Sequence, residues 1–299
     1  MKDYKKKAET NKISNRIKIN LAKSAGFCFG VRRALKIARK MAESNKNIYM
    51  LGDIVHNEGV VKDIEKMGIK KIEGLADGKG KILLIRAHGA SKKIYEEAKK
   101  LGYKIIDATC PKVRQIHKIA REQEEKGYQI IVIGDKKHDE VKGITGQLKN
   151  EALVIDNIKE IPEDRLKDIN KVAVVVQSTQ NIEKVRIIVD KLRSLVNEVR
   201  FFNTICAPTR IKQKEVKDMA RDNDLMIIIG SKRSANTKRL YDISKSINKK
   251  TYWIQSQEDI KTEMFKKIKS VGVTAGASTP DWITEGIINK IKEIAEKVQ

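Results

Sequence analysis

The sequence predicts an α/β fold of three similar α/β units with parallel sheets, arranged around a pseudo-threefold axis. The first observation is a repeat, because the three cysteines stand 82 and 96 residues apart, at Cys28, Cys110 and Cys206. The same two separations recur among three glycines that end apolar runs, Gly52, Gly134 and Gly230. The second observation is that runs such as IIVIG and VAVVV are apolar throughout. Such runs are typical of strands that are buried on both faces of a parallel sheet.

Each unit contains three strand–turn–helix elements in one order. The first strand reaches a cysteine, the second a glycine, and the third a hydroxyl residue near Ser91, Ser178 or Ser278. Segments of helical period, for example VRRALKIARKMAESN, lie between the strands and end in Gly or Asn. We therefore predict units at 17–105, 106–198 and 199–299, the last with a C-terminal segment that closes on the site. They follow a mobile basic leader, 1–16.

The composition indicates a globular protein of 299 residues, with 40% hydrophobic residues, 34% charged residues and a net charge of +24. No apolar run approaches the roughly 18–20 residues of a membrane span, and the N-terminus lacks the apolar segment of a secretory signal. Three widely spaced cysteines in such a chain argue against disulfides and for a reduced, cytoplasmic location. The charge fits nucleic-acid binding, an anionic substrate or a lysine-rich surface, but no nucleic-acid-binding motif supports the first.

All three cysteines follow a predicted strand and precede a predicted helix. Pro111 and Pro208 stand where a helix begins, so the helix dipole is expected to favour thiolates. Ligand sites of parallel sheets lie beyond the carboxyl ends of the strands, and three units around one axis would bring these turns to one cavity. A structural zinc or a cubane iron–sulfur cluster usually takes four protein ligands. Three cysteines, one per unit, therefore predict a [4Fe-4S] cluster with an open fourth iron, and three buried structural cysteines are the alternative.

The other turns are suited to an anion. Three of the four histidines lie in them: His56, His88 and His138. Ser234 and Asn236 stand where a helix is expected to begin. Such side chains, together with helix-start N–H groups, are good phosphate partners, although N-capping is the alternative for Ser234 and Asn236. His117 lies seven residues after Cys110 in a predicted helix, and we interpret it as a packed or surface histidine.

Seven motifs, in this order, resemble those of the LytB/IspH family of 4-hydroxy-3-methylbut-2-enyl diphosphate reductases: AGFCFGVRRAL, GDIVHN, RAHGAS, DATCPKV, HDEVKG, GSKRSAN and GVTAGASTPD. The resemblance covers about residues 17–290. It implies three α/β units around a central iron–sulfur cluster and a two-electron reduction that removes an allylic hydroxyl. The products would be isopentenyl and dimethylallyl diphosphate, in the last step of the non-mevalonate (MEP) pathway. Ferredoxin or flavodoxin would donate the electrons, and we expect a monomer or homodimer that binds neither nucleic acid nor membrane.

The resemblance assigns roles position by position. The cluster ligands would be Cys28, Cys110 and Cys206. The diphosphate would be held by His56, His88, Ser234, Ala235, Asn236 and Ser278, with His138 beside them. Glu140 would deliver a proton, and Ser178 and Thr179 would support Glu140 and the substrate hydroxyl.

The chain departs from the family pattern at several positions. The family usually has Pro where Asp139 stands, Thr where Ser178 stands, and often Ser where Ala235 stands, and the stretch APTRIKQ after the third cysteine also differs. If Asp139 faces the cavity, we expect its charge to raise the pKa of Glu140; if it faces solvent, screening removes most of this effect. The missing hydroxyl at position 235 should weaken diphosphate binding modestly.

Two aspartates of the glycine turns have a structural interpretation. Asp53 and Asp135 directly follow glycines and are interpreted as turn or cap residues.

One rival class is another enzyme with an open-iron cluster, such as a hydro-lyase or a quinolinate-synthase-like protein, and the motifs GVTAGASTPD and HDEVKG argue against it. The other is a basic nucleic-acid-binding protein with an α/β fold. A brown colour on anaerobic purification would separate both enzyme classes from this last one.

Overall fold

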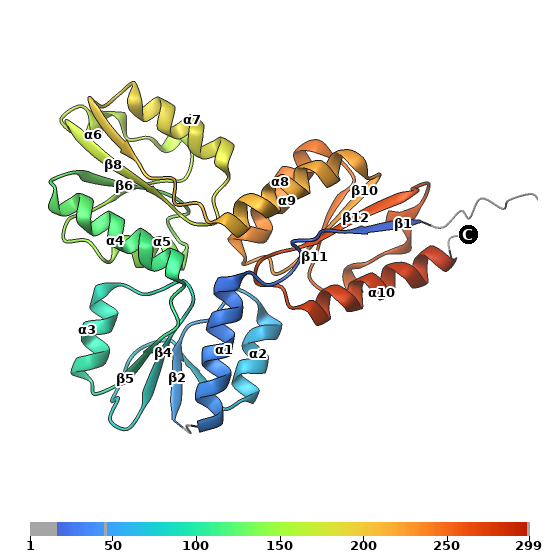
Figure 1. The fold of residues 1–299 in the computed structure, drawn as a ribbon, viewed down its shortest axis with the longest axis horizontal. Helices are drawn as coiled ribbons and strands as arrows, with labels where there is room; N and C mark the ends of the chain where they lie inside the picture. The colour runs from blue at the N-terminus through green and yellow to red at the C-terminus, as the bar shows by residue number, and fades with distance from the viewer. Residues whose placement is uncertain (1–16, 45–46, 298–299) are drawn as a thin grey trace, which may run out of the picture.

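The structure is a computed structural model that describes residues 17–44 and 47–297. It contains three four-stranded sheets in which every paired strand is parallel to its neighbour. Figure 1 shows the three sheets as separate lobes around a common centre. The predicted architecture of three α/β units is therefore confirmed, while the predicted leader, 1–16, lies outside the described residues.

The strand orders of the three sheets match position for position. They are β3-β2-β4-β5, β7-β6-β8-β9 and β11-β10-β12-β1. The strands are β1 (Lys18–Leu21), β2 (Ile48–Leu51), β3 (Lys70–Ile72), β4 (Ile82–Ile85), β5 (Lys104–Asp107), β6 (Gln129–Ile133), β7 (Leu153–Ile155), β8 (Lys171–Val176), β9 (Glu198–Phe201), β10 (Leu225–Ile229), β11 (Thr251–Ile254) and β12 (Ser270–Ala275).

Helices cover both faces of each sheet. The α-helices are α1 (Phe29–Ser44), α2 (Glu58–Lys66), α3 (Lys92–Lys100), α4 (Pro111–Glu125), α5 (Asp139–Thr145), α6 (Glu163–Leu166), α7 (Ile182–Arg193), α8 (Ala207–Asp222), α9 (Ala235–Ile247) and α10 (Asp281–Lys297). Short 3-10 turns are η1 (Ile158–Glu160), η2 (Gln257–Asp259) and η3 (Thr262–Phe265). The pairs α1/α2, α4/α5 and α8/α9 cover one face of their sheets, and α3, α7 and α10 cover the other.

The apolar runs explain why each sheet has a core on both faces. Along β6, Ile131 and Ile133 pack on α7, whereas Ile130 and Val132 pack on α4 and α5. All four side chains are at most 2% exposed, which agrees with the continuous apolar pattern predicted for a doubly covered parallel strand. Burial of two faces per sheet gives each lobe its own hydrophobic core.

The pairing of the strands that lead to the cysteines differs from the simple repeat. The strand before Cys28, β1, pairs with β12, so it completes the sheet of the last unit. In the same way β5 pairs with β4 and β9 pairs with β8. Each strand that leads to a cysteine therefore belongs to one lobe. The helix that follows the cysteine packs on the sheet of the next lobe along the chain. A repeat shows which segments resemble one another but not which strands pair, so the division at 17–105, 106–198 and 199–299 stays a prediction.

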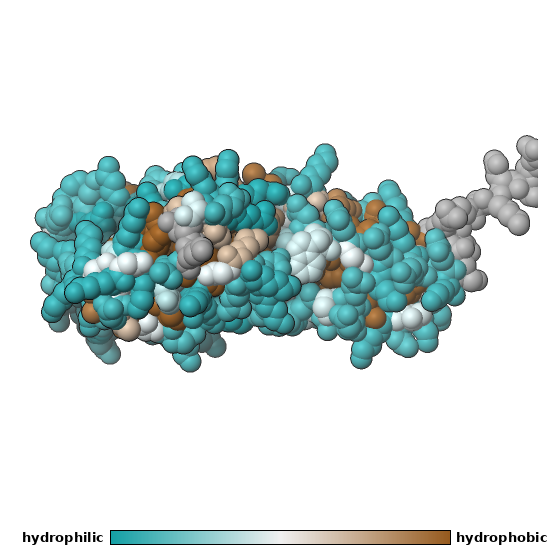
Figure 2. All heavy atoms as spheres, turned by 90° about the horizontal axis from the view of Figure 1, so that it is seen from below, coloured by the Kyte–Doolittle hydropathy of each residue, from teal (hydrophilic) through white to brown (hydrophobic). Residues whose placement is uncertain are grey.

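The surface agrees with the high charge of the chain. The side of the molecule shown in Figure 2 is mostly hydrophilic, with apolar residues visible only in small patches. Among the described residues, we find no helix with the length and apolar character needed to cross a membrane.

Candidate active site

The turns at the carboxyl ends of the strands surround one central cavity with an empty volume of about 710 Å³, including space open to solvent. This position is where parallel sheets normally bind ligands. The structure brings together every predicted site residue in its lining: Cys28, His56, His88, Cys110, His138, Glu140, Ser178, Thr179, Cys206, Ser234, Ala235, Asn236 and Ser278.

One backbone contact repeats at all three cysteines. The N–H of Cys28 donates to the carbonyl of Ala277, that of Cys110 to Ala87, and that of Cys206 to Ser178. Each acceptor is the second residue after the end of the strand that pairs with the cysteine's own strand. Because these bonds are equivalent, they fix the three cysteine turns in the same relation to the cavity.

Each cysteine stands directly before a helix, as predicted. Cys110 and Cys206 are the N-caps of α4 and α8, and α1 begins one residue after Cys28. Burial raises the pKa of the Cys110 and Cys206 thiols, and hydrogen bonds from the following helical turn lower it by less. The helix start therefore favours the thiolates as expected, but loss of hydration outweighs the helix N–H groups for these side chains alone. A bound cationic metal centre would reverse that balance.

The cysteine side of the cavity fits a group held by sulfur. The three thiols are free and half-buried, and they line the cavity together. Gly30 in α1 leaves space beside two of them, since a Cβ there would stand 2.7 Å from Cys110 Sγ and 3.9 Å from Cys28 Sγ. Any larger residue would fill the space between these thiols, so the chain has the donors and the room that an iron–sulfur cluster needs.

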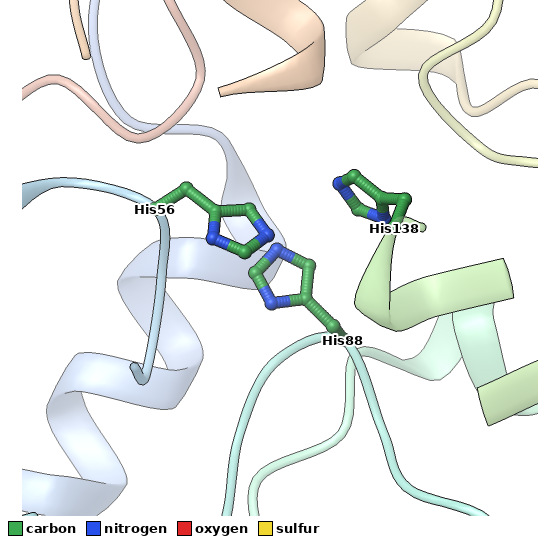
Figure 3. A group of neighbouring side chains, drawn as sticks. All are labelled: His56, His88 and His138. Atoms are coloured by element: carbon green, nitrogen blue, oxygen red, sulfur yellow. The ribbon is translucent and has the colours of Figure 1, made fainter. Parts of the chain in front are cut away.

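The three predicted histidines form a second cluster, drawn in Figure 3. The ring centroids of His56 and His88 are 4.3 Å apart, and His138 lies 5.0 Å from the first and 5.5 Å from the second. One ring nitrogen of each lies within 4.8 Å of the others, so the group could hold a metal ion as well as an anion. Both ring nitrogens of His56, and Nδ1 of His88, are buried without a hydrogen-bond partner among the described residues.

Burial favours the neutral form of these histidines. Burial lowers the pKa of His56 and lowers that of His88 strongly, with further lowering of the His88 pKa by the other two histidines. Burial also lowers the pKa of His138 to about 3. The Nδ1 atom of His138 accepts a hydrogen bond from the Glu140 N–H, so the ring proton is assigned to Nε2. Neutral rings can each donate one N–H, and a bound anion would favour their protonation.

The glycine turns of the three lobes carry residues at equivalent positions, and all of these except Glu58 line the cavity. The fifth residue after the strand end is His56, His138 or Ser234, and the seventh is Glu58, Glu140 or Asn236. Ser234 caps α9 by accepting from the Thr237 N–H, so the predicted capping role is present together with its place in the cavity. Asn236 accepts from the Ala277 N–H at 2.9 Å, and its Nδ2 has no partner among the described residues.

Ala235, Ser278 and Thr179 complete the cavity lining. Ala235 is the first residue of that helix, where backbone N–H groups have no intrahelical partner. Ser278 Oγ donates to the His56 carbonyl at 3.1 Å, so its oxygen remains available as an acceptor. Thr179 Oγ1 accepts from Gln177 Nε2 at 3.1 Å, which leaves its hydroxyl proton free to donate.

Glu140 is the buried acid of the cavity, only 2% exposed. Its two oxygens accept from the Ser178 N–H at 2.6 Å and from Ser178 Oγ at 2.8 Å. Burial raises the pKa of Glu140, and the two bonds from Ser178 lower it by less. Ser at position 178 thus keeps the hydroxyl contact to the acid that the sequence predicts.

Asp139 is not among the causes that raise the pKa of Glu140, although this effect was expected if Asp139 faced the cavity. Its carboxylate accepts from Arg86 Nη1 at 2.8 Å and lies 3.8 Å from His56 Nε2. Burial rather than this carboxylate raises the pKa of Glu140. The Asp139 carboxylate instead favours protonation of His56 and opposes the effect of Arg86 on the His56 pKa.

The sequence interpretation missed the buried lysine Lys212. Lys212 in α8 is buried, and it donates to the carbonyls of Ser24 and Ala275. These bonds hold the turn before the first cysteine. Burial lowers its pKa to about 8. The departure of the stretch APTRIKQ from the family pattern was the only signal for it.

Two sequence interpretations of side chains outside the cavity have clear outcomes. His117 is packed inside, 6% exposed, and burial lowers its pKa to about 4, so its interpretation as a packed histidine is confirmed. Ser91 was expected in the hydroxyl turn, but it is the N-cap of α3 and does not line the cavity. His88 takes the position equivalent to Thr179 and Ser278, the third residue after the strand end.

Comparison with known proteins places the chain in a family. The 4-hydroxy-3-methylbut-2-enyl diphosphate reductase of Aquifex aeolicus is 41% identical over 94% of this chain and 98% of its own length. The enzyme of the same name from Clostridioides difficile is 39% identical over 92% of this chain and 99% of its own.

Solved structures of such enzymes share the fold. A structure of (E)-4-hydroxy-3-methyl-but-2-enyl diphosphate reductase, described as the terminal enzyme of the non-mevalonate pathway, is 40% identical, covers 93% of this chain and 99% of that one, and has a TM-score of 0.69. The Plasmodium falciparum E-1-hydroxy-2-methyl-but-2-enyl-4-diphosphate reductase is 31% identical, covers 92% of this chain and 87% of that one, and has a TM-score of 0.85. The model of the family described as LytB protein matches residues 19–292, and the chain therefore belongs to the LytB family.

Proposed function

We propose that this protein is a 4-hydroxy-3-methylbut-2-enyl diphosphate reductase, which converts (E)-4-hydroxy-3-methylbut-2-enyl diphosphate to isopentenyl and dimethylallyl diphosphate. The observation that carries the proposal is the single cavity that unites three cysteines, a buried acid and an anion site. Relatives of that name at about 40% identity support it. The reaction would be a two-electron reductive dehydroxylation, the last step of the non-mevalonate pathway.

The proposed cofactor is one [4Fe-4S] cluster held by Cys28, Cys110 and Cys206, with an open fourth iron. When bound, the cluster would supply the electrons for the reduction and receive them from ferredoxin or flavodoxin. Free thiols at all three positions favour the reducing cytoplasm as the location. We propose a monomer or homodimer that acts on a small diphosphate without nucleic acid or membrane.

The anion site would hold the substrate by its diphosphate. Its donors are the neutral rings of the histidine cluster, the unpartnered Nδ2 of Asn236, and the first N–H groups of α9. Helix-start N–H groups attract phosphates, and Ala235 would contribute through its backbone. A diphosphate would also relieve the mutual repulsion that opposes protonation of the histidines.

Glu140 would donate the proton that lets the allylic hydroxyl leave as water. The reaction consumes two electrons and two protons per substrate, one proton going to the leaving oxygen and one to carbon. Burial favours the protonated carboxyl, which is the form that a general acid needs. Ser178 fixes both carboxyl oxygens, and the Thr179 hydroxyl is free to donate to the substrate oxygen.

The proposal is tested by anaerobic turnover of the purified, cluster-loaded protein with a reduced dye. Consumption of the allylic diphosphate with release of both isomeric diphosphates is the expected result. The matched comparison is the same alcohol without its diphosphate, which should neither bind nor react. A fully loaded protein that leaves the diphosphate unchanged would overturn the proposal.

The first predicted variant concerns substrate binding. Replacing Asn236 with Ala should weaken substrate binding about 5- to 150-fold, because one hydrogen bond to a charged phosphate contributes roughly 1–3 kcal/mol. The cluster absorbance should stay unchanged, since no cysteine contact is altered. The Michaelis constant and the inhibition constant of pyrophosphate measure the effect.

A second substitution at this position separates the two roles of the amide. Asn236 accepts from the Ala277 N–H, and Asp in its place keeps an acceptor while it removes the donor and adds a negative charge. Asn236→Asp should therefore bind the diphosphate more weakly than Asn236→Ala. Recovery of normal affinity in the Asp variant would assign the effect to the Ala277 contact instead.

A further inference from the structure

The segment that carries Ser234, Ala235 and Asn236 is joined to both of the other lobes by arginines. Arg233 stands directly before it and Arg239 stands one turn into α9. Their partners are Asp53 and Asp135, which occupy the same place in two lobes, the second residue after the strand end. The third lobe has Ser231 at that place. The pseudo-threefold pattern is thus broken: two lobes supply a carboxylate and the third supplies the cations.

The first contact crosses to the lobe of β2. Arg233 Nη1 lies 2.7 Å from Asp53 Oδ2, while Lys71 Nζ lies 2.9 Å from Asp53 Oδ1. Asp53 is only 4% exposed. Burial raises the pKa of this carboxyl, but the ion pairs with Lys71 and Arg233 outweigh burial and lower it, which favours the ionised carboxylate. The interpretation of Asp53 as a simple turn residue is therefore incomplete.

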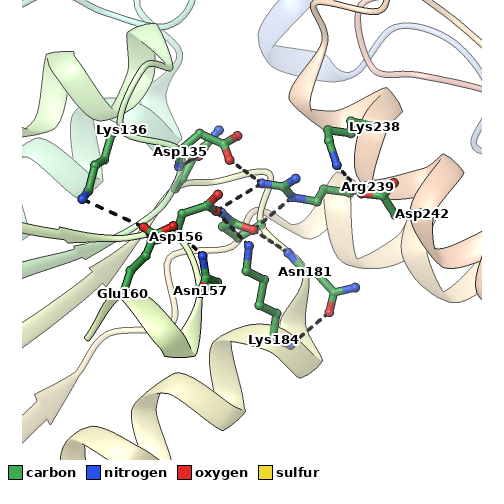
Figure 4. A network of polar contacts seen from close by, with 12 residues as sticks. Asp135, Lys136, Asp156, Asn157, Glu160, Asn181, Lys184, Lys238, Arg239 and Asp242 are labelled. Carbon is green, nitrogen blue, oxygen red and sulfur yellow. Dashed lines mark hydrogen bonds and ion pairs between the residues drawn. The ribbon is translucent and has the colours of Figure 1, made fainter. Parts of the chain in front are cut away.

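The second contact crosses to the lobe of β6, and its arginine is more deeply buried than Arg233. Figure 4 shows Arg239 reaching from α9 toward Asp135 and Asp156, which follow β6 and β7. Its Nη2 lies 2.8 Å from Asp135 Oδ1 and 3.9 Å from Asp156 Oδ1, and its Nε donates to Gln180 Oε1 at 3.0 Å. The Arg239 side chain is 7% exposed. Such a planar group with several fixed acceptors allows little freedom of orientation.

We propose that Arg233 and Arg239 are positioning residues, which hold the diphosphate-binding segment Ser234–Asn236 against the cavity by pairing with Asp53 and Asp135. The proposal deepens the proposed function and rests on it. The two arginines enclose the segment at either end, so each fixes one end of it relative to a different lobe. Loss of a buried partner leaves an uncompensated charge, and the segment would then no longer face the two histidine-bearing lobes in one orientation.

The test measures pyrophosphate affinity of the cluster-loaded protein, together with its cluster absorbance and melting temperature. We expect Arg239→Gln to weaken pyrophosphate binding roughly 2- to 30-fold with unchanged cluster absorbance, which is the usual range for a residue acting through another. Arg239→Lys should recover part of the affinity. Lys238→Gln is the matched control, because it removes the same charge from the neighbouring position, where Lys238 only pairs with Asp242 in an exposed contact.

The outcomes separate three cases. If Arg239→Gln melts earlier but binds pyrophosphate as tightly as the parent, the arginine is merely structural and the inference is wrong. If Arg239→Gln does not fold, Arg233→Gln decides, because that side chain is 57% exposed and its loss should be tolerated; normal affinity there overturns the inference. If the parent itself does not bind pyrophosphate, the proposed function fails rather than the role of the arginines.

Discussion

A Cys110→Ser variant is expected to lose most of its iron and nearly all turnover, and the same result is expected for Cys28→Ser and Cys206→Ser. The three thiols line one cavity, and the backbone N–H of each cysteine donates to an equivalent carbonyl of a neighbouring turn. No fourth cysteine exists in the sequence to replace a lost ligand. Serine is a poor substitute, because soft thiolate ligands are what iron–sulfur clusters require. Iron analysis and the absorbance of the anaerobic protein measure the loss.

The control for this prediction is Ser91→Ala. Ser91 also stands at a helix start, yet it makes no side-chain capping bond and does not line the cavity. Its iron content should equal that of the parent, which separates loss of a ligand from disturbance of a helix start. Full iron and full turnover in all three cysteine variants would remove the cluster from the proposal.

The cysteine turns could be predicted because their signals are local. A strand, a cysteine and a proline stand close together in the sequence at Cys110 and Cys206, and the common spacing relates them to Cys28. The acid–hydroxyl contact of Glu140 with Ser178 was within reach only through the family resemblance, since 38 residues separate the two. Local patterns and a resemblance therefore named residues that line one cavity.

What the sequence could not predict depends on contacts between distant segments. Asp53 looks like a turn residue until Arg233 of another lobe is placed beside it, and Asp139 could face either way until Arg86 is located. Strand β1 lies within the predicted first unit, 17–105, but its partner β12 lies near the other end of the chain. The effect of burial on the pKa of the Cys110 and Cys206 thiols could not be predicted for the same reason, because burial depends on how three lobes close around the cavity.

A Glu140→Gln variant is expected to keep its cluster and bind substrate, yet to lose turnover by about 10²-fold or more, the usual scale for a lost general acid. Glutamine matches the shape of the acid and can still accept from Ser178, but it has no proton to release. Because burial raises the pKa of Glu140, the protonated form persists to higher pH than in an ordinary glutamate. Turnover of the parent should therefore fall as pH rises through that raised pKa. The residual turnover of the variant should not show this decrease.

The matched control is Glu58→Gln, at the equivalent seventh position after the strand end in another lobe. Glu58 accepts from Ser231 Oγ at 3.0 Å, a bond that glutamine can also accept, and it does not line the cavity. Its turnover and pH profile should match those of the parent. Near-normal turnover in Glu140→Gln, with iron content confirmed, would mean that the proton comes from another group. His138 would then be the first to test, because its ring is in the same cavity and its Nδ1 contacts the Glu140 N–H.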